Sequence, residues 1–104
     1  MGMDMRKLMK QAQKMQAEAR QVQESLARET VEATAGGGAV RVVATGAQEI
    51  RSLRVSPEVL AAGDAEMLED LLLAAINDAL NRSRALAQQA MAKVTGQLQL
   101  PPLG

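Results

Sequence analysis

A run of apolar and small residues at alternating spacings of three and four is the strongest constraint in this sequence. The run consists of Met5, Leu8, Ala12, Met15, Ala19, Val22 and Leu26. This spacing places the side chains on one face of a helix, and the segment contains neither Gly nor Pro. The pattern predicts a long amphipathic helix over residues 4–28, with the Asp4 side chain as its N-cap.

Such a helix is about 36 Å long at 1.5 Å per residue. The chain has only 104 residues, enough for one small domain. It contains no Phe, Trp or Tyr, so each apolar position buries little area. We therefore expect part of the helix to project from the body, and the thin core to be completed by self-association into a homo-oligomer.

Short β-branched segments separated by glycines follow the first helix and predict a sheet over residues 29–55. The expected strands are Glu29–Thr34, Ala39–Thr45 and Glu49–Val55. Glycine-containing turns over residues 36–38 and 46–48 connect them, because Gly adopts positive φ without strain. Links this short imply an antiparallel meander.

The alternation of side chains within the strands indicates which face of the sheet is covered. Val40, Val42 and Ala44 share one face of the second strand, while Arg41, Val43 and Thr45 share the other. This pattern suits a sheet covered mainly on one side. In the third strand the apolar Ile50 and Leu53 fall on opposite faces, which suggests a β-bulge.

A second long helix is predicted over residues 64–95. Asp64 is its expected N-cap and Gly96 its expected end. Before it, Ser56 and Pro57 end the third strand and are expected to cap a short turn. Residues 97–104 carry no charge and contain two prolines, so we expect an extended or disordered tail.

The absence of Cys and His from the sequence excludes several classes of function. Without Cys there is no disulfide or thiolate zinc site, and without His the commonest general base is missing. The glycines at 36–38 lack the Gly-Lys-Ser/Thr of a phosphate-binding loop. We therefore expect no enzyme activity, cofactor, metal or small-molecule substrate.

The longest uninterrupted apolar run is the six residues Leu71–Ile76, far below the 18 or so that a membrane span needs. The N-terminal residues also lack the apolar stretch of a signal peptide. The expected location is therefore the cytoplasm, without a membrane.

The zero net charge of the chain conceals a strongly uneven distribution. Residues 1–28 carry six basic and three acidic side chains, residues 57–81 carry six acidic and no basic ones, and residues 82–104 carry three basic and no acidic ones. The acidic block at the start of the second helix, and the cations expected near its end, both agree with the helix dipole.

Basic side chains of the first helix lie away from its apolar seam. They are either ordinary solvated side chains or a stripe that contacts phosphates. If the second interpretation holds, charge alone selects Arg6, Lys7, Lys10 and Lys14 of the first helix as phosphate-contacting candidates, together with Arg82 and Arg84 of the second.

The sequence resembles the YbaB/EbfC family of bacterial nucleoid-associated proteins over nearly its full length. The resemblance is carried by four stretches in the same order, which are residues 8–16, residues 35–42, residues 68–72 together with 75–80, and residues 95–101. It implies an α+β protomer of order α-β-β-β-α, with a three-stranded antiparallel meander between two long helices. It also implies a tweezer-like homodimer that binds double-stranded DNA, organises the nucleoid or affects gene expression, and acts in the cytoplasm.

A second hypothesis remains open. The protein could be a dimeric scaffold whose helical arms bind a partner protein, with the Met-rich first helix as an adaptable surface. The neutral net charge and an isoelectric point near 6.3 favour this alternative.

Overall fold

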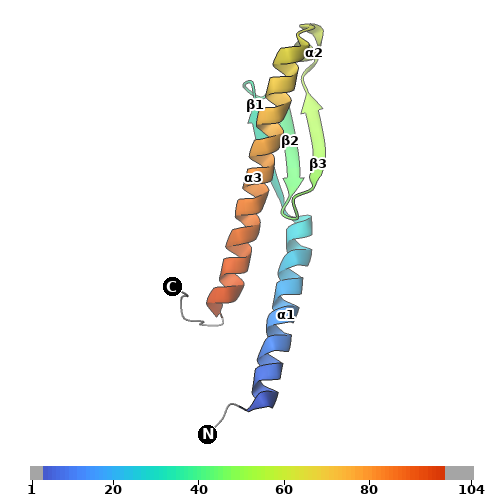
Figure 1. The fold of residues 1–104 in the computed structure, drawn as a ribbon. Helices are drawn as coiled ribbons and strands as arrows, with labels where there is room; N and C mark the ends of the chain where they lie inside the picture. The colour runs from blue at the N-terminus through green and yellow to red at the C-terminus, as the bar shows by residue number, and fades with distance from the viewer. Residues whose placement is uncertain (1–3, 98–104) are drawn as a thin grey trace, which may run out of the picture.

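The computed structural model describes residues 4–97. Its elements in chain order are α1 (Met5–Arg28), β1 (Thr30–Ala35), β2 (Val40–Thr45), β3 (Ile50–Val55), α2 (Pro57–Ala61) and α3 (Ala65–Gln97). The strands form one antiparallel sheet in the order β1-β2-β3, with α3 running along it and α1 extending away from its end (Figure 1). This arrangement confirms the predicted α+β fold class. The expected tail lies outside the described residues, except for Gln97, which belongs to α3.

Helix α1 projects from the body, as its length predicts (Figure 1). Its N-terminus is capped by Asp4, whose carboxylate accepts a hydrogen bond of 3.0 Å from the Arg6 amide. Residues 5–17 are all exposed, and Leu26 is the one buried residue of this helix. Most of the apolar seam is therefore not covered within the protomer.

The core lies between α3 and one face of the sheet, where α3 packs on β1 and β2. The buried residues are Ala33, Val40, Val42, Ala44, Ala75 and Ala79. Alanine and valine bury less apolar area than leucine or an aromatic residue. The core is thus as thin as the lack of aromatic residues predicts.

The turns agree in place with the sequence but differ in detail. Gly36, Gly37 and Gly38 all have positive φ, as expected. In the β2–β3 turn, however, the residue with positive φ is Gln48, at 64°, and not Gly46. Gly46 is needed for space, because an added Cβ would lie 2.8 Å from the carbonyl oxygen of Leu26.

The expected irregularity of β3 is confirmed. Val43 pairs with Ser52 and Ala44 pairs with Ile50, so Arg51 is an extra residue in the ladder. The bulge places both Ile50 and Leu53 opposite core residues of β2. A strict alternation would have separated them.

Thr45 lies on the face of Arg41, as the alternation predicts, but it is buried there. Its hydroxyl accepts hydrogen bonds from the amides of Ala47 and Glu49. The buried Ser83 of α3 donates a hydrogen bond of 2.6 Å to the Thr45 carbonyl and accepts one of 3.0 Å from the Gln48 amide. These bonds fasten α3 to the β2–β3 turn.

The caps of the later helices are confirmed. The Ser56 hydroxyl accepts a hydrogen bond from the Val59 amide, although the expected turn is the short helix α2. Asp64 accepts one of 3.1 Å from the Met67 amide at the start of α3. The prediction that Gly96 ends this helix is wrong, since α3 continues through it to Gln97.

Candidate nucleic-acid interface

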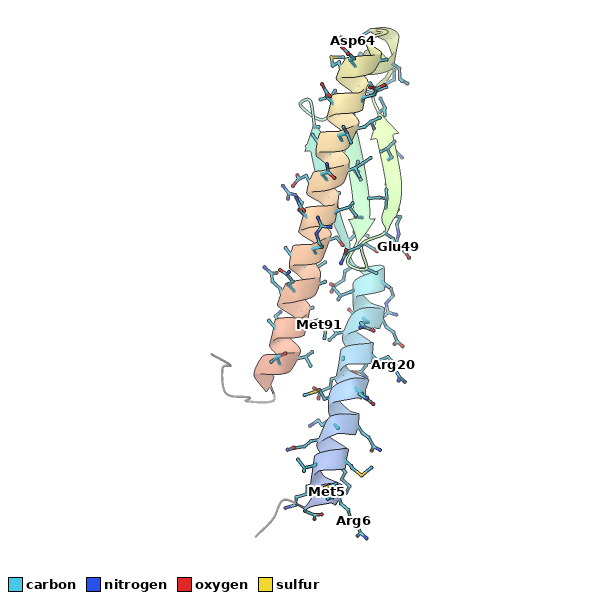
Figure 2. All side chains as sticks on the ribbon, viewed as in Figure 1. Met5, Arg6, Arg20, Glu49, Asp64 and Met91 are labelled. Carbon is cyan, nitrogen blue, oxygen red and sulfur yellow. The ribbon has the colours of Figure 1, made fainter. Side chains whose placement is uncertain are left out.

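The projecting part of α1, residues 5–17, is here called the arm. It carries four cations and no carboxylate, and every one of its residues is exposed. The cations are the predicted candidates Arg6, Lys7, Lys10 and Lys14. Figure 2 shows Arg6 at the free end of the arm, far from the sheet.

The lysines of the arm share one face of the helix. Lys7, Lys10 and Lys14 follow at intervals of three and four residues, so their side chains are neighbours along the helix surface. Within residues 4–97 the ion pairs are Arg41 with Glu32 and Arg82 with Asp78, and neither involves the arm. The arm cations are thus available to an external anion.

The structure places Arg82 and Arg84 in the middle of α3. Arg82 donates a hydrogen bond of 3.2 Å to Asp78, and Arg84 donates one to Asn81. The last turn of α3 holds no basic residue, so the prediction that these cations follow the helix dipole is wrong.

The two groups of candidates are not brought together. Glu18 of α1 and Lys93 of α3 line the same groove and fix the alignment of the two helices. Lys14 lies four residues from Glu18 toward the free end of the arm, and Arg82 lies eleven residues from Lys93 in the opposite direction. At 1.5 Å per residue the two are about 22 Å apart along the axis. The arm and the middle of α3 therefore form separate basic regions.

The acidic block lies at the opposite end of the molecule from the arm. Asp64, at the start of α3, and Arg6 mark the two ends in Figure 2. The protomer measures 74 × 28 × 16 Å, so its acidic and basic ends are several Debye lengths apart at physiological salt. Within residues 4–97 no three acidic side chains gather as a metal site would require.

A groove of about 530 Å³ separates α1 from the C-terminal half of α3. Val22, Leu86 and Val94 provide apolar walls, and Glu18 and Lys93 are the charged residues nearest the arm. One carboxylate oxygen of Glu18 is buried and has no hydrogen-bond partner among the described residues. The groove marks where the arm leaves the body.

An exposed apolar surface on β3 was missed by the sequence analysis. Leu53 is paired with the buried Val42 and Ile50 with the buried Ala44, so both point to the core side of the sheet. They are nevertheless 45% and 41% exposed, because α3 covers only β1 and β2. The β-bulge was the available sequence signal, since it turns both residues to this side.

Helix α3 extends the same apolar surface. Leu73, Ile76 and Leu80 follow at intervals of three and four residues and so share one side of the helix. Arg84, four residues further on, lines a small pocket together with Gln48 of the β2–β3 turn. This side of α3 therefore faces the β3 half of the sheet, and Leu73 is 61% exposed there.

No helix within residues 4–97 combines the length and the apolar character that crossing a membrane requires.

Comparisons with known proteins agree on one family. A model described as the YbaB/EbfC DNA-binding family matches residues 1–98. Proteins named nucleoid-associated protein from Pelotomaculum thermopropionicum and Desulforamulus reducens are 50% and 52% identical to this chain, each over 99% of this chain and 98% of the relative.

Among solved structures, the uncharacterized protein HP0035 from Helicobacter pylori has a similar fold. Its TM-score is 0.76 at 25% sequence identity, covering 93% of this chain and 99% of that chain. These matches confirm the family resemblance inferred from the sequence.

Proposed function

Because the chain belongs to the YbaB/EbfC DNA-binding family, we propose that it is a nucleoid-associated protein that binds duplex DNA as a homodimer, mainly through phosphate contacts. The observation that carries this proposal is the arm, which presents four cations, no carboxylate and no internal ion pair. The match to a DNA-binding family whose relatives are named nucleoid-associated proteins confirms the expectation that the chain is not an enzyme. Its site of action is the nucleoid, in the cytoplasm.

Affinity in this proposal comes from the release of counterions. Each phosphate that a Lys or Arg neutralises contributes about −0.9 to the slope of log K against log salt. The four arm cations of one protomer contribute about −3.6, and the eight of a homodimer about −7.2. Lysines bind phosphate as point charges and read no base edges, so sequence preference is weak.

Duplex DNA is favoured over single strands because the chain has no aromatic residue. Stacking of bases on aromatic side chains, worth about 1–3 kcal/mol per base, is what holds single strands in most proteins that bind them. Without it, a single strand offers fewer phosphates per unit length than a duplex and gains nothing in return.

The homodimer is supported by the exposed apolar surface of Ile50, Leu53 and Leu73. This surface adjoins the core and lies on the part of the same sheet face that α3 does not cover. A second copy matches it in chemistry, since the same surface is apolar on both copies and a two-fold axis pairs it with itself. We expect Leu53→Glu to halve the mass in solution, from twice 11.0 kDa to 11.0 kDa, as measured by light scattering.

The test of DNA binding is the triple variant in which Lys7, Lys10 and Lys14 are replaced by Glu. We expect its affinity for a short duplex, measured by fluorescence anisotropy at low salt, to fall more than about a hundredfold. The arm contribution to the salt slope should drop from about −7.2 to about −1.8. Mass and melting temperature should change little, because all three side chains are exposed.

A matched control replaces Gln11, Gln13 and Gln16 by Ala in the same turns of the arm. It alters the helix surface without altering charge, so its affinity should equal that of the wild type. Equal binding by the lysine variant would show that the arm lysines are not the site and would leave Arg6, Arg82 and Arg84 as the remaining candidates.

The alternative, a scaffold that binds a partner protein, is favoured by the exposure of Met5 and Met9, at 69% and 59%. Such flexible apolar side chains suit protein surfaces that adapt to a partner. The salt series separates the two functions. The absence of DNA binding at low salt, or binding indifferent to salt, would leave the scaffold as the better account.

A further inference from the structure

The side of the sheet opposite α3 is here called the open face. It consists of the outward-pointing residues Thr30, Glu32, Thr34, Arg41, Val43, Ser52 and Arg54. Except for the half-buried Val43, all of these residues are exposed. Helix α3 packs on the core side of the sheet, and α1 makes only a small contact with β2. Thr45, the cross-strand partner of Thr30, also lies on this side but is buried at the end of the strand.

Two arginines stand directly opposite each other on this face. Arg41 of β2 is the cross-strand partner of Arg54 of β3. Like charges in this position are destabilising. Arg41 is held by Glu32 at 3.3 Å, whereas Arg54 has no ion pair in the described part of the chain. The open face thus keeps an uncompensated positive charge that an added anion would neutralise.

The arginines border a hollow of about 490 Å³. Its other walls include Gly38, Ser52 and Ser56, and its one carboxylate is that of Glu32. Val43, Val55 and Pro57 line it as well, so apolar side chains lie among its polar groups. Guanidinium groups donate bidentate hydrogen bonds to phosphate, which an ammonium group cannot do.

We propose that the open face is a second phosphate-contacting surface, which takes the backbone of a second duplex while the arm holds the first. This inference rests on the proposed DNA binding by the arm. Its consequence is that one molecule can bridge two duplexes.

The distance between the two surfaces supports two duplexes rather than one. From Lys14 to the end of α1, and then along β2 to Arg41, the separation is about 34 Å at ordinary helix and strand rises. Along that path Glu18, Glu24 and Glu29 stand against Arg20 and Arg28, a net charge of −1. A single duplex laid along the molecule would therefore meet no continuous basic surface between the arm and the open face.

The test measures bridging and simple binding side by side, using the full chain. In the first assay, protein captures a free fluorescent duplex on beads that carry a second, immobilised duplex. In the second, fluorescence anisotropy gives the affinity for one short duplex. For the double variant Arg41→Ser and Arg54→Ser, we expect capture to fall by about tenfold or more. Affinity for the single duplex should stay within about twofold, and the salt slope of capture should become shallower by about 1.8 for each open face that contacts the second duplex.

Two further variants on the same face test whether a loss of capture is electrostatic or comes from a loss of folding. Thr30→Ala with Thr34→Ala changes exposed side chains without changing charge and should leave capture unaltered. Glu32→Gln removes the one carboxylate and should increase capture. The opposite directions expected for the arginine and glutamate variants distinguish an electrostatic effect from a loss of folding.

Each other outcome overturns the inference in a different way. Unchanged capture by the arginine variant assigns bridging to the arms alone. A parallel loss of affinity for the single duplex makes the open face part of the primary site. Binding of one duplex by the wild type without any capture removes the second surface but keeps the proposed function. Failure of the wild type to bind even one duplex at low salt overturns the proposed function itself.

Discussion

Gly46 joins the arm-bearing helix to the sheet, and its replacement by Ala gives a sharp test of that junction. A Cβ at this position would lie 2.7 Å from Cδ2 of Leu26 and 2.8 Å from the Leu26 carbonyl oxygen. Leu26 is the one buried residue of α1. The Gly46 amide also donates a hydrogen bond of 2.9 Å to the carbonyl of Glu29, so the turn is held close to the helix.

The cost of this substitution follows from which atoms collide. A side chain such as that of Leu26 can rotate away, but its backbone carbonyl moves only if α1 moves. Overpacking of this kind costs about 1–3 kcal/mol, and contact with backbone favours the upper end. At about 4 °C per kcal/mol for a domain near 100 residues, about 3 kcal/mol corresponds to a fall of about 12 °C in melting temperature.

Circular dichroism at the helix band measures this fall directly. Gly96→Ala is the matched control, because an added Cβ there meets nothing within 4 Å and the residue is helical. It should stabilise the protein by up to about 1 kcal/mol. A melting temperature for Gly46→Ala within about 2 °C of the wild type would refute the argument that this glycine is required for close approach.

Two further substitutions test the fastening of α3. Ser83→Ala removes a buried hydroxyl that donates to the Thr45 carbonyl and accepts from the Gln48 amide. Because the Gln48 amide also donates to the Thr45 carbonyl, we expect the free energy of unfolding in urea to fall by only about 1–2 kcal/mol. No loss would show that the hydroxyl is dispensable. Asp64→Ala removes the acceptor for the Met67 amide and should lower the free energy of unfolding by about 1 kcal/mol. Asp64→Asn should restore most of this loss, because Asn is also a good N-cap. An equal loss in both variants would count against capping as the cause.

Local sequence signals were sufficient for the order and type of the main elements. The spacing of apolar residues from Met5 to Leu26 predicts α1, and its length predicts that part of it projects. Asp4, Ser56 and Asp64 identify the helix starts, because a cap acts on amides two or three residues away. The bulge in β3 was also predictable, since it corrects a visible break in alternation.

Features that depend on tertiary contact were not predictable from the same signals. The role of Gly46 depends on the approach of Leu26, which lies twenty residues earlier in the chain. The burial of Thr45 depends on its neighbours in the turn and on Ser83. The exposure of Leu53 depends on whether α3 covers β3, and the sequence of β3 gives no indication of this.

The candidate site was predicted in part. The arm cations could be selected because they lie in a stretch without carboxylates, and the structure adds that this stretch has no ion pair. Arg82 and Arg84 were wrongly grouped with the end of α3, since both lie more than ten residues before the end of the helix predicted over residues 64–95 and of the helix observed. Which of the six candidates contact DNA remains a prediction.

The separation of the acidic and basic ends changes what the average properties of this chain mean. With zero net charge, it exerts almost no pull on a polyanion at long range. Within a Debye length of about 8 Å, however, an approaching duplex interacts with the arm and the flanking Asp4 and Glu18, because the block around Asp64 is tens of ångströms away and screened by salt. A search for polyanion-binding proteins that ranks sequences by isoelectric point would miss this chain. A search that ranks them by the local charge of each helical turn would find it.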